Sequence, residues 1–324
     1  MGKQAFIVKR LAQSLITLLA LMTVTFFIFR LMPGDPVTIL ISEGRLDPQA
    51  QARIREQFGL DQPIYIQYMH YLRNLLTGNF GMSFFYNRGV GEIIRESLVN
   101  SLVLVLPSMS MAILVGVIVG SILGWYRGRK VEVAGVVIAL FLQSLPVFWL
   151  AILILMIFSY KLNWFPTGSM FTPGPIADGF SKFLSKDFIH HLALPFATSF
   201  LIYVSAPLLL MRNSMLDTKG EDFLQFLKAK GVKEITLIQH GFRNGLLPVV
   251  TYIAVMSSYV IEGNVLLEVV FSWPGMGREL VDAVIRRDYP VAQGAFFVMG
   301  LVLIIMNLLA DLLYGYLDPR VTYK

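Results

Sequence analysis

The chain of 324 residues contains no cysteine, which excludes disulfides, thiolate catalysis and cysteine-ligated metal sites. Charge is scarce as well. Asp, Glu, Lys and Arg make up 15% of the residues, whereas soluble domains average about 25%. The GxxxxGK[ST] pattern is missing, so this chain does not hold ATP phosphates on such a loop. These absences favour a membrane protein without its own nucleotide chemistry.

Histidine is also rare, with four residues and no HExxH pattern. His190 and His191 are adjacent at the start of an apolar run, where a place at the membrane interface is expected rather than a ligand role. No Ser/His pair on a recognisable motif supports an intramembrane enzyme. We therefore expect no catalytic residue and no metal site in this chain.

Long uncharged runs are what the chain has in abundance, because hydrophobic residues make up 56% of it. Each run is near the ~20 residues that a helix needs to cross about 30 Å of hydrocarbon. Lipid cannot satisfy an open sheet edge, so an all-α membrane protein with six transmembrane helices is predicted. The six uncharged runs are 11–29, 97–126, 133–160, 188–211, 244–261 and 289–310.

Basic residues predict the orientation. Segments placed inside hold 14 Lys and Arg in 59 residues, against 13 in 125 residues outside. This excess follows the positive-inside rule and puts both termini in the cytoplasm. The inside segments are 1–10, 125–133, 212–243 and 317–324, and the outside segments are 30–100, 161–187 and 262–288.

The long outer segment carries two helix patterns. Asp47-Pro48 begins one that Gly59 ends, and Asp61-Gln-Pro63 begins a second that Gly78 closes. A passive cover over the bundle and a docking surface for another protein are equally compatible with it.

Three glycines in the second predicted span follow a small-xxx-small spacing: Gly116, Gly120 and Gly124. Such a strip lets two helix backbones approach closely. It fits packing within the chain or an interface with another subunit.

The predicted cytoplasmic segment 212–243 contains a short amphipathic helix pattern over 221–231. Acidic residues open it and basic residues close it, as the helix dipole favours, and Gly231 can stop it because glycine adopts the left-handed conformation. Phe223, Leu224, Phe226 and Leu227 are spaced to form one bulky apolar face. This face can sink into lipid headgroups or fit a socket on a partner protein.

This segment, from Glu221-Asp-Phe-Leu-Gln-Phe-Leu-Lys-Ala-Lys-Gly-Val to Gln239-His-Gly-Phe-Arg-Asn-Gly-Leu-Leu-Pro248, resembles the coupling loop of the dipeptide/oligopeptide/nickel permease family. These proteins are membrane subunits of ATP-binding-cassette (ABC) importers. Further matching stretches follow in order along the whole chain: Phe29-Arg-Leu-Met-Pro-Gly-Asp-Pro36, Gly59-Leu-Asp-Gln-Pro63, Gly78-Asn-Phe-Gly-Met-Ser83, Ser144-Leu-Pro146, His191-Leu-Ala-Leu-Pro195, Glu268-Val-Val-Phe-Ser-Trp-Pro-Gly-Met-Gly277, Arg287-Asp-Tyr-Pro-Val-Ala-Gln-Gly294 and Asp318-Pro-Arg320.

The resemblance implies a type I ABC importer permease fold in the cytoplasmic (inner) membrane, with a small helical extracytoplasmic insertion between the first two spans. It implies a homologous second permease, two ABC ATPase subunits and a substrate-binding protein as partners. ATP and magnesium would be bound by the ATPases and not by this chain. The implied division is an N-terminal transmembrane helix over 1–30, an extracytoplasmic helical loop over 31–96, a core over 97–317 with the coupling loop 212–243, and a cytoplasmic tail over 318–324.

The resemblance also implies the coupling residues Glu221, Asp222, Phe223, Phe226, Leu227, Ala229, Lys230 and Gly231. Family members usually have small residues at the positions of Phe226 and Leu227, which suggests a co-adapted ATPase socket. Glu262 and Asn264 flank a glycine where the family tends to have small neutral residues. We expect Glu262 to line the substrate path or to lie exposed at the interface. Asp311, one turn after Asn307, is expected to hydrogen-bond between helices rather than to relay protons.

Three functions compete at this point. The first is a permease subunit importing di- or oligopeptides, with nickel chelates or oligosaccharides as other cargoes of the same class. The second is an ion-coupled secondary transporter, which would need inverted repeats and ion ligands near mid-membrane, and the sequence shows neither beyond Asp311. The third is the intramembrane enzyme disfavoured above.

Overall fold

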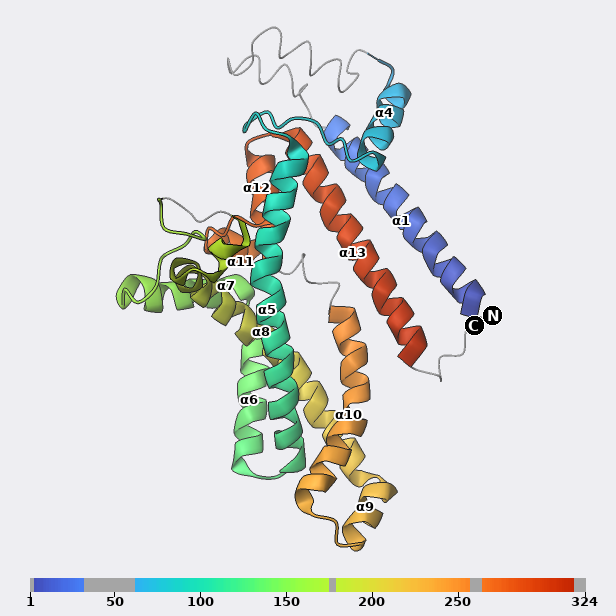
Figure 1. Ribbon diagram of the computed structural model, residues 1–324, viewed down its shortest axis with the longest axis vertical. Helices are drawn as coiled ribbons and strands as arrows, with labels where there is room; N and C mark the ends of the chain where they lie inside the picture. The colour runs from blue at the N-terminus through green and yellow to red at the C-terminus, as the bar shows by residue number, and fades with distance from the viewer. Residues whose placement is uncertain (1–2, 32–61, 175–178, 257–263, 318–324) are drawn as a thin grey trace. The chain divides into compact units, whose positions relative to one another are not determined.

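The computed structural model describes residues 3–31, 62–174, 179–256 and 264–317. Within these ranges the regular structure is helical, apart from one isolated bridge between Met82 and Gly89. The all-α class predicted from the sequence is therefore confirmed. Figure 1 shows the helices, which are α1 (Lys3–Leu31), α4 (Ile64–Leu76), α5 (Val90–Trp125), α6 (Lys130–Ser144), α7 (Val147–Ile154), the π-helix η1 (Leu155–Lys161), the 3₁₀-helix η2 (Gly179–Leu184), α8 (Lys186–Gly220), α9 (Asp222–Ala229), α10 (Glu234–Met256), α11 (Val265–Val270), α12 (Met276–Ile285) and α13 (Tyr289–Leu317).

The chain divides into two compact units. The first unit comprises Met1–Asn100, Gly275–Leu308 and Thr322–Lys324, and the second comprises Ser101–Pro274 and Leu309–Val321. The first therefore holds α1, α4 and α12, and the second holds α6 to α11. Helices α5 and α13 contribute to both.

Four helical segments are long and apolar enough to cross a membrane: Ile7–Arg30, Val90–Trp125, Lys186–Gly220 and Tyr289–Leu312. The helices over 130–144 and 147–161 add a fifth if they form one span. The predicted span over 244–261 falls partly on α10 and partly on residues outside the described ranges. The described residues thus show four or five candidate spans, and the predicted count of six is not confirmed.

The uncharged run over 133–160 is not one straight helix. The helix direction bends by 103° between its two halves, with Leu145 and Pro146 both in extended backbone conformations between them. Proline has no N–H to give to the preceding turn, and it disfavours helical geometry in the residue before it. Pro146 therefore ends α6 and begins α7.

The three spaced glycines of α5 pack against α8 within the second unit. A Cβ on Gly116 would lie 2.8 Å from the carbonyl oxygen of Val204, and one on Gly124 would lie 2.6 Å from that of Arg212. Gly120 approaches the backbone of Leu208 more closely still. Of the two interpretations of this strip, packing within the chain is the one that the structure shows.

In the first unit, α4 follows its prediction. Pro63 is its N-cap residue, and Gly78 lies just beyond it with a φ of +72°, a conformation that favours glycine. Leu75 packs with Met22 of α1 and Phe297 of α13. The other predicted helix, over 48–59, lies outside the described residues.

A buried carboxylate joins two stretches that carry the family resemblance. Asp288 accepts hydrogen bonds from the Ser83 hydroxyl, from the Phe84 amide at 3.2 Å and from the Phe85 amide at 3.1 Å. Charge-assisted bonds of this kind are about twice as strong as neutral ones. Asp288 therefore fixes the segment before α5 to the turn between α12 and α13.

Candidate coupling site

The short helix α9 lies at the turn between two long helices, α8 and α10 (Figure 1). Helix α8 ends at Gly220, α9 begins at Asp222 and α10 begins at Glu234. The amphipathic helix predicted over 221–231 is thus present, with regular helix over Asp222–Ala229.

The start of α9 follows directly on the end of α8. Gly220 completes α8, and Glu221 takes the N-cap position in an extended conformation. The Gln225 amide donates a hydrogen bond of 3.1 Å to the Gly220 carbonyl oxygen. This side chain thereby satisfies a carbonyl that the end of α8 leaves without a helical partner.

The end of α9 forms a Schellman motif. The amide of Gly231 donates to the carbonyl of Lys228 at 3.0 Å, and the amide of Val232 donates to the carbonyl of Leu227 at 3.2 Å. Gly231 has a φ of +76°, which glycine adopts without a steric penalty. The predicted stop at Gly231 is therefore present in the geometry that such a stop needs.

One side of α9 packs against other helices of the second unit. Leu224 is only 4% exposed and lies in a cluster with Trp125, Met215 and Leu237, with Leu227 partly buried against it. Gly241 of α10 lies under Leu224, because a Cβ there would be 3.7 Å from its Cδ1. Leu224 and Leu227 therefore attach α9 to the bundle and are not part of a free apolar face.

The other side of α9 is solvent-accessible in this chain. Phe223 and Phe226 are exposed, Phe226 by 58%, and the Lys230 ammonium lies 4.4 Å from the centre of the Phe226 ring. The single apolar face predicted from the spacing is thus split in two, with leucines inward and phenylalanines outward. Glu221, Asp222, Ala229, Lys230 and Gly231 are exposed as well.

Sequence reasoning missed the residues that connect the helices around α9, at the corner where α8, α9 and α10 meet. The Trp125 indole N–H donates to Glu234 at 2.9 Å, and Lys219 donates to the Trp125 carbonyl at 2.6 Å. The Lys219 ammonium also lies 5.0 Å from the Trp125 ring centre. A tryptophan at the end of an apolar span, followed by basic residues, was the available signal. These contacts connect the ends of α5 and α8 to the start of α10.

An ion pair was also missed. Glu132, at the start of α6, accepts hydrogen bonds from Arg212 of α8 and from the Gly128 amide. Both charged side chains are largely buried. Losing one partner of such a pair costs more than a surface pair contributes, because the remaining charge stays desolvated.

The two residues assigned to the substrate path have different outcomes. Glu262 lies outside the described residues. Asn264 is 2% exposed at the start of α11, where its side chain interacts with Tyr203. Four residues later, the buried Glu268 accepts a hydrogen bond of 2.5 Å from Ser101, a polar contact that the sequence analysis did not identify.

The histidines have structural partners. His191 Nδ1 lies 3.1 Å from the carbonyl oxygens of Gly168 and Ser169, and His190 Nε2 lies 2.8 Å from that of Trp164. Both thus hold the loop after η1. Within the described ranges, no group of three or more His, Cys, Asp or Glu side chains is placed to hold a metal ion.

The chain matches known proteins over almost its whole length. The family model described as "Binding-protein-dependent transport system inner membrane component" matches residues 112–323, and its N-terminal counterpart matches residues 3–105. Three relatives are the glutathione transport system permease protein GsiC of Salmonella typhi, the di/tripeptide transport system permease protein DppB of Pseudomonas aeruginosa and the oligopeptide transport system permease protein AppB of Bacillus subtilis.

Identity to these relatives is 35% for GsiC, 33% for DppB and 35% for AppB. The matches cover 98%, 99% and 98% of this chain and 99% of each relative. The matched region includes the apolar helices and the segment from α8 through α9 to α10. The chain is a multi-pass membrane protein that belongs to the family of binding-protein-dependent transport system inner membrane components.

Proposed function

We propose that this chain is a permease subunit of an ATP-driven importer and forms half of the pathway for di- or oligopeptides. The observation that carries the proposal is α9, a short helix attached to the bundle by Leu224 while Phe223 and Phe226 remain uncovered. The named relatives support the cargo, since their names refer to glutathione, di- and tripeptides and oligopeptides. Nickel chelates and oligosaccharides are not favoured by these names.

The proposed topology has six spans and both termini in the cytoplasm. Residues 31–96 form the extracytoplasmic insertion after the first helix at 1–30, residues 97–317 form the core, and 318–324 form the tail. Support comes from the twofold higher density of basic residues in the segments placed inside. The four or five candidate spans of the described residues are compatible with this arrangement.

The partners follow from the proposed role. A second permease completes the pathway, a substrate-binding protein delivers the peptide, and two ATPase subunits bind ATP and magnesium. This chain performs no catalysis itself and needs no cofactor. Its family membership supports such an assembly, because the family is defined by binding-protein-dependent transport.

In this assembly α9 transmits force. Phe223 and Phe226 insert into the ATPase cleft. Lys230 packs over the Phe226 ring at the edge of the cleft. The acidic Glu221 and Asp222 and the exposed Ala229 lie along the contact, while Gly231 allows the chain to turn out of it. Leu227, expected to be a docking anchor, instead holds α9 to its own bundle.

The proposed cycle uses this rigid corner. Closure of the ATPase pair draws the two coupling helices together, and the permease pair opens outward to accept peptide. Hydrolysis of ATP returns the pair to the inward state. Because Trp125, Lys219 and Glu234 connect three helices near α9, a displacement of α9 moves α5, α8 and α10 with it. Glu262 and Asn264 are proposed to line the path and to favour the peptide amino terminus.

Replacing Phe226 tests the coupling role. In Phe226→Asp, a charge replaces an exposed ring, so the chain should still fold but should lose its ATPase partner. Buried aromatic anchors contribute about 2 kcal/mol or more to an interface, which corresponds to roughly thirtyfold weaker association. The measurement is the amount of ATPase that copurifies with the tagged chain and the peptide uptake of the reconstituted complex.

The matched control is Phe180→Asp. Phe180 is 73% exposed on η2, away from α9 in the sequence. This variant should retain its ATPase. Equal retention by Phe226→Asp would contradict the docking role of Phe226. Uptake by the purified chain alone, driven by an ion gradient, would instead establish the secondary transporter.

A further inference from the structure

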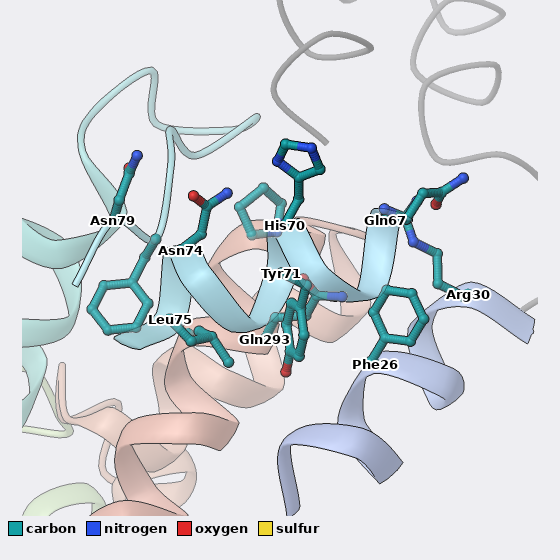
Figure 2. Close-up of a pocket in the computed structure, with 12 residues that line it drawn as sticks. Phe26, Arg30, Gln67, His70, Tyr71, Asn74, Leu75, Asn79 and Gln293 are labelled. Carbon is teal, nitrogen blue, oxygen red and sulfur yellow. The ribbon is translucent and has the colours of Figure 1, made fainter. Parts of the chain in front are cut away.

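A small pocket and a buried ion pair lie outside the residues that the coupling proposal uses. The pocket has a volume of about 40 Å³ and is lined by residues of α1, α4 and α13 (Figure 2). Of the side chains that line it, the Gln67 amide already donates to the Gln62 carbonyl at 2.8 Å, and the Arg30 guanidinium lies over the Phe26 ring. With these side chains engaged, the pocket shows no preference for a particular class of ligand.

The ion pair joins α6 to α8 in the second unit. The Arg212 Nε atom donates to Glu132 Oε1 at 3.0 Å, and Nη2 donates to the same oxygen. The other carboxylate oxygen accepts a hydrogen bond of 3.3 Å from the Gly128 amide, in the turn between α5 and α6. Glu132 is 5% exposed, so water competes little for these bonds. Glu132 thus connects α8 both to α6 and to the turn that follows α5.

The remaining packing of α6 on α8 is apolar. Ala139 of α6 lies in one cluster with Leu208 of α8 and Leu123 of α5, and apolar contacts have no preferred direction. Within the described ranges, the pair of Glu132 and Arg212 is the only polar connection between α6 and α8. Because the planar guanidinium fork requires a defined geometry, this pair fixes the position of one helix along the other.

Stability alone does not account for an ion pair that is buried at this place. Taking two charges out of water is costly, and apolar residues of similar volume often stabilise a protein interior as well or better. The best-attested use of such a pair is to fix how two elements are aligned. A role in which the alignment of α6 with α8 matters is therefore favoured.

The pair lies close to the coupling helix. Arg212 is about 12 Å along the helix axis from Gly220, the last residue of α8, at a rise of about 1.5 Å per residue. Between them, Met215 packs in the same apolar cluster as Leu224 of α9. A displacement of α9 is thus passed to α8 at Met215 and reaches Arg212 about one turn further along.

We propose that Glu132 and Arg212 are positioning residues that make α6 follow α8 when the ATPases move α9. This role rests on the function proposed above and extends it. The contacts of Trp125, Lys219 and Glu234 involve α5, α8 and α10, and the ion pair adds α6. Because α6 leads directly into the bend of 103° and then into α7, the pair also connects α9 to this bent segment.

The test uses the full complex with its partner subunits and binding protein, reconstituted in proteoliposomes. Uptake of a mixture of labelled di-, tri- and pentapeptides and hydrolysis of ATP are measured in the same sample. The double variant Glu132→Gln with Arg212→Met removes both charges, so that no buried charge is left without its partner. Uptake per ATP should fall about fivefold or more, as expected when a coupling between two sites is lost. Hydrolysis itself should be retained, because Phe223 and Phe226 still contact the ATPase.

The matched control is Arg88→Met with Glu96→Gln, which removes an exposed ion pair of 2.8 Å near the start of α5. It should keep the uptake per ATP of the unmodified complex. If the first double variant fails to assemble, Arg212→Lys takes its place. Lysine keeps the charge but lacks the planar fork, so uptake per ATP should fall about twofold or more.

Each outcome decides the proposal. A ratio of uptake to hydrolysis that falls in the ion-pair variant and not in the control supports the positioning role. An unchanged ratio would overturn it, and so would an equal fall in the control or a parallel loss of uptake and hydrolysis, which marks a purely structural pair. Absence of ATP-driven uptake in the unmodified complex would instead overturn the proposed function on which this role rests.

Discussion

At the scale of single residues, Glu279 of α12 carries an unusual electrostatic environment. Its side chain is partly buried, and Oε1 is buried without a hydrogen-bond partner among the described residues. The Tyr86 hydroxyl faces the other oxygen at 3.4 Å, and Arg286 donates to that hydroxyl at 2.9 Å. Burial raises the pKa of Glu279 above its ordinary value of 4.5, with the charges of Asp282 and Asp288 adding to the rise, while Tyr86 and Arg286 lower it.

This environment predicts a pH dependence of stability. Because the folded pKa is raised, the folded chain binds more protons than the unfolded chain at pH values just above 4.5. The free energy of unfolding should therefore fall as the pH rises from about 4.5 through the folded pKa. Glu279→Gln, which cannot ionise, should flatten this part of the profile, as measured by unfolding midpoints of the purified chain from pH 4 to 8.

Tyr86→Phe provides the comparison, since it removes the hydroxyl that lowers the pKa of Glu279. In this variant the fall in stability should extend to higher pH. A profile that keeps its full slope in Glu279→Gln would show that another group titrates there.

At the scale of elements, the contact of α5 with α8 depends on the absence of side chains. Gly120→Ala would place a Cβ against the carbonyl of Leu208, where only backbone atoms lie and nothing flexible can yield. Overpacking of this kind costs about 1–3 kcal/mol. The variant should unfold at a lower temperature in detergent than the unmodified chain.

Gly91→Ala, on the same helix, is the control for this prediction. A Cβ at Gly91 would meet the Phe80 ring at 3.8 Å, an ordinary contact. Alanine also favours helix over glycine, so stability should be unchanged or slightly higher. Equal loss in both variants would point to a general sensitivity of α5 and would contradict the close approach at Gly120.

Local chemistry made several elements predictable. The opening of α4 at Pro63, the stop of α9 at Gly231 and the all-helical class depend on short-range rules that act within a few residues. The split face of α9 was not predictable in this way. Phe223, Leu224, Phe226 and Leu227 share one spacing pattern, and only the position of Trp125 and Met215 beneath the helix selects the leucines for burial. The bend of 103° between α6 and α7 is likewise absent from the hydrophobic periodicity, although Pro146 itself ends α6.

At the scale of the whole molecule, the number of membrane crossings between α4 and α9 decides on which side of the membrane each of these helices lies. Helices α5 and α8 are each long and apolar enough to cross the membrane. The bent pair, which consists of α6 and of α7 with η1, lies between them in the sequence. If the bent pair crosses, three crossings separate α4 from α9 and place them on opposite sides. If the bent pair instead enters and leaves the membrane on the same side, only two crossings separate α4 from α9, and these two helices lie on the same side.

The absence of cysteine makes this parity measurable, because a single introduced thiol is then the only one in the chain. Met69→Cys places it on the exposed surface of α4, and Lys228→Cys places it on α9. In intact cells a membrane-impermeant maleimide should label the Met69→Cys variant and spare the Lys228→Cys variant, and inside-out vesicles should give the reverse. Three crossings and the excess of basic residues near α9 both require this result. Labelling of both variants from one side would instead make the bent pair a re-entrant segment, and α9 could then face the ATPase only if α4 were cytoplasmic as well.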